Sequence, residues 1–215
     1  IPIIKENEIL KLRSIGTGNK VELIYHIAKE EIFLLKKQND DDDNENEKLT
    51  KREIENYCKV QHPFMPKLIG IGEKCEYLII EFIKGRPLSD MNNAEFTYNE
   101  KIRIFFEMMI IIEFFHRKQF IYRDLKPSNI MIDENKTSVL LDFDRMIEYE
   151  NSFNTKTKDF SSTYCAPEVN EIDYQFSYEC DIYSLGKIFL YLMNQDLNEF
   201  LKSEFKISKK SLMKV

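Results

Sequence analysis

The sequence predicts an α+β fold with two lobes, an antiparallel sheet with one helix in the first lobe and mainly helix in the second. Two observations support this prediction. Short apolar and β-branched segments dominate residues 1–83, whereas long apolar helical patterns dominate residues 84–215. Between them lies the turn-forming run Gly85-Arg86-Pro87. The chain of 215 residues is long enough for two small lobes that share a cleft.

The first lobe is predicted to contain five strands and one helix. The expected strands span residues 9–15, 21–25, 31–35, 67–71 and 77–82. Residues 39–47 are nearly all Asp, Asn and Glu, so we expect a solvated acidic loop there. The helix is expected over residues 50–60, with Thr50 as its cap and His62-Pro63 as its stop.

The second lobe is predicted to be built around two apolar helices, over residues 99–118 and 182–193. Two short strands, residues 130–132 and 139–141, form a hairpin between them. A hinge between the lobes is expected near residues 83–87. Residues 148–163 are polar and rich in Ser and Thr.

Composition excludes several classes of protein. The net charge of -6 argues against a nucleic-acid binder, which usually carries a clustered basic surface. The four cysteines lie far apart, so we expect free thiols in a reducing, cytoplasmic compartment. The longest apolar run, residues 105–115, contains two glutamates and is too short to span a membrane.

The chemistry-bearing residues lie around the predicted hairpin. Asp124 and Asn129 precede it, and Asp142 follows it. Because a hairpin brings its two ends together, these three side chains can converge. Two oxygen ligands, from Asn129 and Asp142, suit Mg²⁺, and a further carboxylate can accept a hydroxyl proton. This set matches the needs of phosphoryl transfer.

The run Tyr122-Arg123-Asp124-Leu125-Lys126-Pro127-Ser128-Asn129, followed by Leu141-Asp142-Phe143-Asp144, resembles the catalytic and magnesium loops of eukaryotic-type protein kinases. The resemblance extends over nearly the whole chain. Ile15-Gly16-Thr17-Gly18 resembles a phosphate loop, and Ala166-Pro167-Glu168 resembles the end of an activation segment. Lys126 matches the serine/threonine-specific pattern.

The resemblance implies ATP and Mg²⁺ as cofactors and a protein as substrate, and it leaves the oligomeric state open. It implies catalytic roles for Asp124, Lys126, Lys36 and Glu53, with Lys37 a neighbouring alternative to Lys36. Asn129 and Asp142 would hold the metal. The implied nucleotide-binding residues are Ile15, Gly16, Gly18, Leu23, Lys36, Ile80, Glu81 and Ile83, with Ile80 as gatekeeper.

Other family positions are implied to be structural or regulatory. Asp181 would bind backbone amides of the catalytic loop. Arg123 is expected to pair with a phosphate added to the activation segment. The candidate phosphorylation sites are Thr155, Thr157 and Ser161. A hydrophobic column through both lobes would contain Tyr57, Leu68, Tyr122 and Phe143.

The chain departs from the family pattern at several positions. Asp144 replaces the glycine of the magnesium motif, where it can restrict backbone motion or add charge to the metal site. Val21 occupies the third glycine position of the phosphate loop, and Tyr122 replaces a histidine. The last helices of the family would lie beyond Val215, so we expect the second lobe to be incomplete.

Two further interpretations stay open. A binding module related to kinases, with little or no catalysis, is compatible with Asp144 and Val21. A small-molecule phosphotransferase of the aminoglycoside or choline type shares the Asp, Asn and Asp arrangement. The pair Lys126-Pro127 and the run Ala166-Pro167-Glu168 disfavour the latter, because they serve a peptide-binding platform.

Overall fold

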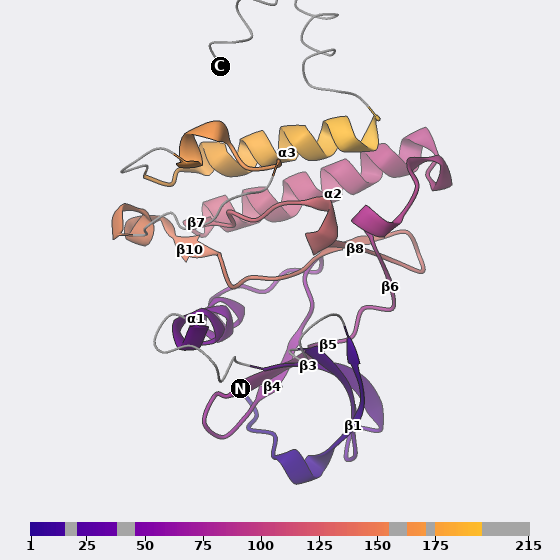
Figure 1. Cartoon of the computed structure of the whole chain (residues 1–215), viewed down its shortest axis with the longest axis vertical. Helices are drawn as coiled ribbons and strands as arrows, with labels where there is room; N and C mark the ends of the chain where they lie inside the picture. Colours follow the sequence, from indigo (N-terminus) through magenta and orange to yellow (C-terminus); the bar gives the residue numbers. More distant parts are fainter. Residues whose placement is uncertain (16–20, 38–45, 155–162, 171–174, 195–215) are drawn as a thin grey trace, which may run out of the picture.

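The computed structural model describes residues 1–15, 21–37, 46–154, 163–170 and 175–194. The chain has the two lobes that the sequence predicts, with a five-stranded sheet and helix α1 in one and the long helices α2 and α3 in the other (Figure 1). The two long helices lie next to each other, on the side of the molecule away from the sheet. The fold class is therefore confirmed.

The first lobe is an antiparallel sheet in the order β1-β2-β3-β5-β4. Its strands are β1 (Ile9–Ile15), β2 (Val21–His26), β3 (Glu31–Lys37), β4 (Leu68–Ile71) and β5 (Tyr77–Glu81). All five were predicted within two residues at each end. One face buries a small core that includes Ile24, Leu35 and Ile79. The other face turns toward the second lobe.

Helix α1 (Asn46–Lys59) begins four residues earlier than predicted, so Thr50 lies inside the helix rather than at its cap. The first two helical residues also belong to the segment predicted as an acidic loop, and residues 38–45 lie outside the described part. The prediction failed here because glutamate and lysine are good helix formers, so a polar run does not by itself end a helix.

The second lobe is organised by helices α2 (Tyr98–Arg117) and α3 (Tyr178–Leu192). Thr97 and Glu100 form a capping box at the start of α2, in which each side chain accepts a hydrogen bond from the other residue's backbone N–H. Helix α3 begins four residues before its predicted start. Its first turn contains Glu179 and Asp181, whose charges favour a helix N-terminus.

Short elements complete the second lobe. The predicted hairpin is present as β8 (Ile130–Asp133) and β9 (Ser138–Leu140). Strand β6 (Gly85–Pro87) pairs with β8, so part of the predicted hinge belongs to the second lobe and residues 82–84 connect the two sheets. Strands β7 (Phe120–Ile121) and β10 (Ile147–Glu148) form a separate pair that was not predicted. Short 3₁₀ helices cover Glu6–Glu8, Leu88–Asp90, Asn93–Glu95, Pro127–Asn129, Tyr149–Asn154 and Pro167–Asn170.

One hydrophobic core joins the lobes. The rings of Tyr57 of α1, Phe143 and Tyr122 pack one against the next. The ring centroids are 5.1 Å apart for Tyr57 and Phe143 and 5.9 Å apart for Phe143 and Tyr122. Leu68 packs against the same core. The predicted hydrophobic column is therefore confirmed, and it connects α1 to the loop of residues 122–129.

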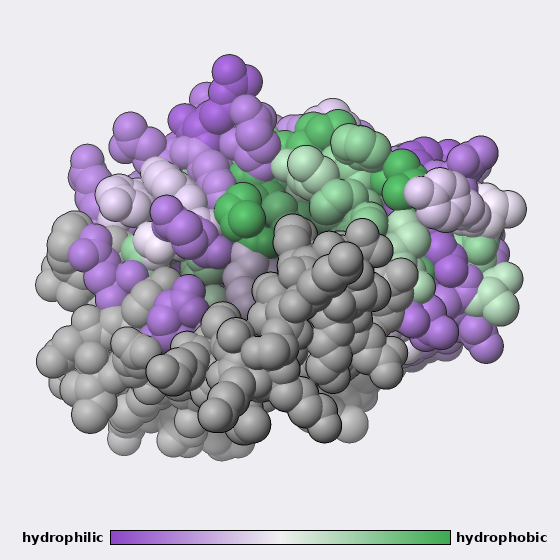
Figure 2. Space-filling view, turned by 90° about the horizontal axis from the view of Figure 1, so that it is seen from above, coloured by the Kyte–Doolittle hydropathy of each residue, from purple (hydrophilic) through white to green (hydrophobic). Residues whose placement is uncertain are grey.

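The face of α2 that looks away from this core remains apolar. Figure 2 looks onto the end of the second lobe and shows apolar side chains gathered among polar ones. Among the described residues, the exposed large apolar residues of the long helices are Tyr98, Phe106, Met109 and Ile110 on α2 and Ile182 on α3. Within the described residues, no helix combines the length and hydrophobicity needed to cross a bilayer.

Candidate active site

The strand register gathers the predicted nucleotide-binding residues of the first lobe on one face of the sheet. Val21 is paired with both Ile15 and Lys36, and two residues further along Leu23 is paired with Leu34, which is paired with Ile80. Directly paired residues share a face, as do residues two apart on one strand. Ile15, Leu23 and Ile80 therefore lie on the same face as Lys36.

Lys36 is the centre of a charged cluster that joins the lobes. Its ammonium Nζ lies 3.0 Å from Oε1 and 2.8 Å from Oε2 of Glu53 on α1. The same Nζ donates to Oδ1 of Asp142 at 2.6 Å. Lys37, the alternative that the sequence left open, pairs instead with Glu22 at 2.7 Å. The geometry thus selects Lys36 as the lysine of the site.

The protonation of this cluster reflects its burial. Burial raises the pKa of the Glu53 carboxyl to about 7, and the charge of Lys36 opposes the rise. Burial would lower the pKa of Lys36, but Glu53 and Asp142 outweigh burial and raise that pKa above its usual 10.5. Lys36 is therefore a fixed positive charge.

A second cluster lies in the loop before β8. Lys126 Nζ donates to both carboxylate oxygens of Asp124, at 3.1 and 2.8 Å. Asn129 Nδ2 donates to Oδ2 and to the backbone carbonyl of Asp124, both at 2.9 Å. Asp124 and Asn129 are both buried. Asp124 is therefore in contact with both other side chains predicted for this loop, Lys126 and Asn129.

A buried carboxylate holds this loop in place. Asp181 of α3 accepts hydrogen bonds from the backbone N–H groups of Tyr122 and Arg123, both at 2.8 Å. His116, at the end of α2, lies 2.9 Å from the same carboxylate. The backbone of Arg123 has a positive φ of 70°, a conformation that needs such support. The implied structural role of Asp181 is confirmed, whereas the contact of His116 was not predicted.

The hairpin brings Asp142 to the catalytic loop. The backbone N–H of Leu141 donates to the carbonyl of Asn129 at 2.8 Å, and the hydroxyl of Tyr122 donates to the carbonyl of Leu141 at 2.5 Å. Both bonds tie the residue before Asp142 to the loop of Asp124. These two hydrogen bonds thus connect the Lys36–Glu53–Asp142 cluster to the Asp124–Lys126–Asn129 cluster.

The residues present fit a divalent cation. Asn129 and Asp142 supply the oxygen donors that Mg²⁺ prefers. Oδ1 of Asp144 is a buried carboxylate oxygen that has no hydrogen-bond partner within the described part of the chain. Burial, and next the charge of Asp142, raise the pKa of Asp144. Within the described residues, no three His, Cys, Asp or Glu side chains are already gathered as a metal site.

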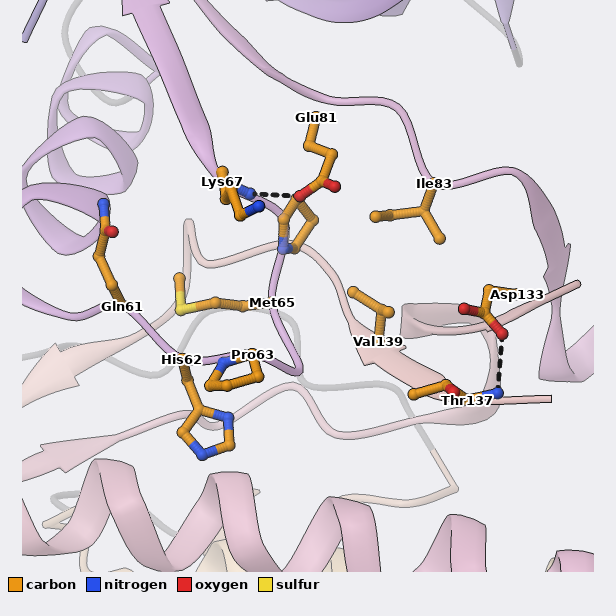
Figure 3. A pocket seen from close by; sticks show the side chains of 11 residues that line it. Gln61, His62, Pro63, Met65, Lys67, Glu81, Ile83, Asp133, Thr137 and Val139 are labelled. Carbon is orange, nitrogen blue, oxygen red and sulfur yellow. Dashed lines mark hydrogen bonds between the residues drawn. The ribbon is translucent and has the colours of Figure 1, made fainter. Parts of the chain in front are cut away.

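A pocket of about 530 Å³ lies beside the hinge (Figure 3). Its lining comes from the segment after α1, from Glu81 and Ile83, and from Asp133, Thr137 and Val139 of the β8–β9 hairpin; the residues after α1 are Gln61, His62, Pro63, Met65, Pro66 and Lys67. Glu81 and Ile83 were predicted to bind nucleotide through their backbone, and their side chains face this pocket. The pocket is therefore separate from the charged clusters.

Several predicted residues lie outside the described residues. These are Gly16 and Gly18 of the phosphate loop and the candidate phosphorylation sites Thr155, Thr157 and Ser161. Arg123, their proposed partner, is buried against the ring of Phe176 at 4.4 Å and donates through Nε to the carbonyl of Arg145 at 2.7 Å. The phosphorylation hypothesis stays a prediction.

Comparisons with known proteins agree with this geometry. The model of the protein kinase domain family matches residues 9–214. The chain is 30% identical over 204 residues to a probable serine/threonine-protein kinase MARK-C of Dictyostelium discoideum, covering 87% of this chain and 26% of that protein. It is 29% identical over 191 residues to the carbon catabolite-derepressing protein kinase of Saccharomyces cerevisiae, covering 86% of this chain and 30% of that protein.

A third relative is a probable serine/threonine-protein kinase KIN1 homolog of Encephalitozoon cuniculi, 33% identical over 141 residues. That alignment covers 64% of this chain and 25% of the relative. The chain thus spans about a quarter to a third of the length of the curated relatives it matches. With a family model that covers almost all of its residues and the charged groups of the family in contact, the chain belongs to the protein kinase domain family.

Proposed function

We propose that this protein is an ATP-dependent serine/threonine protein kinase. The observation that carries the proposal is the joining of the Lys36–Glu53–Asp142 cluster to the Asp124–Lys126–Asn129 cluster at the junction of the lobes. A domain that had lost catalysis would have no need to keep both clusters, and the names of the similar proteins point to the same activity.

Each residue has a proposed role in phosphoryl transfer. The bond between the substrate hydroxyl oxygen and the γ-phosphorus forms while the bond from that phosphorus to the β–γ bridging oxygen breaks. Asp124 orients the hydroxyl and accepts its proton, and Lys126 stabilises charge on the transferred phosphoryl group. Glu53 aims Lys36 at the α- and β-phosphates. Mg²⁺, held by Asn129 and Asp142, would neutralise phosphate charge when it is bound.

Specificity for serine and threonine hydroxyls is part of this proposal. It is supported by Lys126, which contacts Asp124 directly in the loop, and by the names of the relatives. We also propose that the protein works in a reducing compartment such as the cytoplasm. Its four cysteines are all unpaired, in agreement with that proposal.

The test is ATP turnover with Mg²⁺ and a generic basic protein substrate, followed by identification of the phosphorylated amino acid. We expect phosphoserine and phosphothreonine, and we expect transfer to vanish in Asp142→Asn. Glu134→Gln, which removes one exposed carboxylate paired with Lys84, is the matched control and should transfer normally. Folded protein that binds ATP without transferring phosphate would instead support the binding module.

A further inference from the structure

Asp144 occupies the position where the family pattern has glycine, yet the backbone there does not require glycine. Positive φ occurs at Asp142, with a value of 63°, but not at Asp144. A side chain is therefore accommodated at Asp144 without the strain of a left-handed conformation. The reason for a carboxylate at this position must lie in the surroundings of the side chain.

Those surroundings leave the carboxylate incompletely satisfied. Oδ1 of Asp144 is buried and has no hydrogen-bond partner among the residues that the structure describes. A buried carboxylate oxygen without a donor is unfavourable, because it has lost its water and gained nothing in return. Phe143, the preceding residue, is fully buried in the hydrophobic column. The unsatisfied oxygen is thus held next to the catalytic centre by a rigid neighbour.

The charges around Asp144 are those of the active site. Its strongest charged neighbour is Asp142, followed by Lys36 and Asp124, and Arg145 acts on it more weakly. The charge of Asp144 also raises the pKa of Glu53. Glu53, Asp124, Asp142 and Asp144 are four carboxylates, whereas Lys36 and Lys126 are two ammonium groups. With Arg145 included, these residues hold four carboxylates and three cations, so when all are ionised they carry a net negative charge that a divalent cation can offset.

We propose that Asp144 is an additional ligand, direct or through a water molecule, for the divalent cation that binds with the nucleotide. This inference rests on the proposed kinase function, since it concerns the metal of that same site. Among the described residues, no three acidic, histidine or cysteine side chains are already gathered as a metal site. On this proposal, cation binding brings the side chains of Asp142 and Asp144 closer together. The expected consequence is tighter metal binding than glycine at this position would give.

The experiment measures metal binding rather than turnover. Mn²⁺ is titrated into the protein in the presence of a non-hydrolysable ATP analogue, and free Mn²⁺ is followed by electron paramagnetic resonance. We expect roughly tenfold weaker Mn²⁺ binding in both Asp144→Asn and Asp144→Gly than in the unmodified chain. Glu134→Gln removes one exposed carboxylate elsewhere, so its Mn²⁺ affinity should not change.

The outcomes separate this inference from the proposed function. Equal Mn²⁺ affinity in the unmodified chain and in both variants would overturn the role of Asp144 and leave the kinase proposal standing. An unmodified chain that binds neither the analogue nor Mn²⁺ would overturn both. Thermal unfolding checks that the variants are folded. If Asp144→Asn does not fold, Asp144→Gly, the residue of the family pattern, decides the question alone.

Discussion

The two charged clusters of the active site are built in different ways. Asp124, Lys126 and Asn129 lie within six consecutive positions of one loop, and their contacts are local in sequence. Lys36, Glu53 and Asp142 come from a strand, a helix and a loop, and Lys36 is 106 positions away from Asp142. The first cluster therefore depends on the conformation of a single loop. The second exists only when both lobes are folded and packed together.

This difference separates residues whose removal affects chemistry from residues whose removal also affects the fold. In the local cluster, the side chain of Asp124 is 8% exposed and keeps its hydrogen bond from Asn129 when Lys126 is removed. In the long-range cluster, the side chain of Glu53 is 2% exposed, and removing Lys36 takes away the cation that lies against both of its carboxylate oxygens. The following predictions test this contrast.

The largest effect is expected for Asp124→Asn. Asparagine has nearly the same shape and keeps the contact with Asn129, but it cannot accept the hydroxyl proton. We expect kcat to fall about 100- to 10,000-fold, the usual contribution of a general base. Steady-state kinetics and thermal unfolding of the same sample measure both properties. A large loss of stability would show that the local cluster is structural after all.

The next effect is a difference in stability between Lys36→Met and Lys126→Met. Lys36→Met leaves the buried Glu53 without its cation, so the free energy of unfolding should fall by about 3 kcal/mol at pH 8. Lys126→Met should lower it by less than about 1 kcal/mol, since Asp124 keeps its bond from Asn129.

Urea unfolding of the two methionine variants measures this difference. The difference in stability loss should narrow at pH 6, because Glu53 then takes up a proton and no longer needs a cation. Its pKa is about 7 with Lys36 present and rises further when Lys36 is removed. Equal losses at pH 8 would contradict the contrast between the clusters.

The pH dependence of kcat/KM should follow the protonation of Glu53. As the pH falls through about 7, Glu53 is protonated and releases Lys36, so kcat/KM should fall by about tenfold for each pH unit below 7. Glu53→Gln should be less active at pH 8 and should lack this acidic limb. An unchanged limb in Glu53→Gln would assign it to another group.

Stability should follow the opposite trend from activity. The pKa of Glu53 is raised in the folded state above its usual 4.5, so the folded state binds more protons between those two values. The contribution of Glu53 to the free energy of unfolding therefore increases as the pH falls from about 7 to 4.5 and decreases as it rises again. Comparing urea unfolding of Glu53→Gln with that of the unmodified chain at pH 5 and pH 8 measures this contribution.

The smallest effect is expected for Tyr122→Phe. The substitution removes the hydroxyl that donates to the carbonyl of Leu141, next to Asp142. It leaves the ring in the hydrophobic column. We expect a loss of about 1 kcal/mol in the free energy of unfolding and roughly a fivefold lower kcat, because the two clusters are less firmly joined. Unchanged kinetics would show that the hairpin alone positions Asp142.

Much of the fold could be read from the sequence because the patterns are local. Alternating apolar residues marked the strands β1 to β5, and the apolar period of residues 99–118 marked α2. The errors fell at the starts of α1 and α3, where charged residues belong to the helix, and at the short strands β6, β7 and β10. A strand of two or three residues is too short to show an alternating apolar pattern, so it can be identified only from its pairing.

The candidate site was predictable to a similar degree. Residue type and spacing made the run from Tyr122 to Asn129 and the motif at Asp142 recognisable, because phosphoryl transfer needs particular residue types at fixed positions. The choice between Lys36 and Lys37 could not be made this way, because neighbouring lysines look alike in a sequence. The support that His116 gives to Asp181 was also hidden, since the two residues are 65 positions apart.

The sequence by itself determined the two-lobe α+β fold and the loop that holds Asp124, Lys126 and Asn129, because both follow from short-range patterns. Only the tertiary structure decided which lysine meets Glu53 and Asp142 and how Asp181 holds the loop that contains Asp124. It also decided that Oδ1 of Asp144 is buried with no hydrogen-bond partner among the described residues. The physical reason is that strand register and lobe packing set the distances between residues far apart in the chain, and no local pattern records those distances.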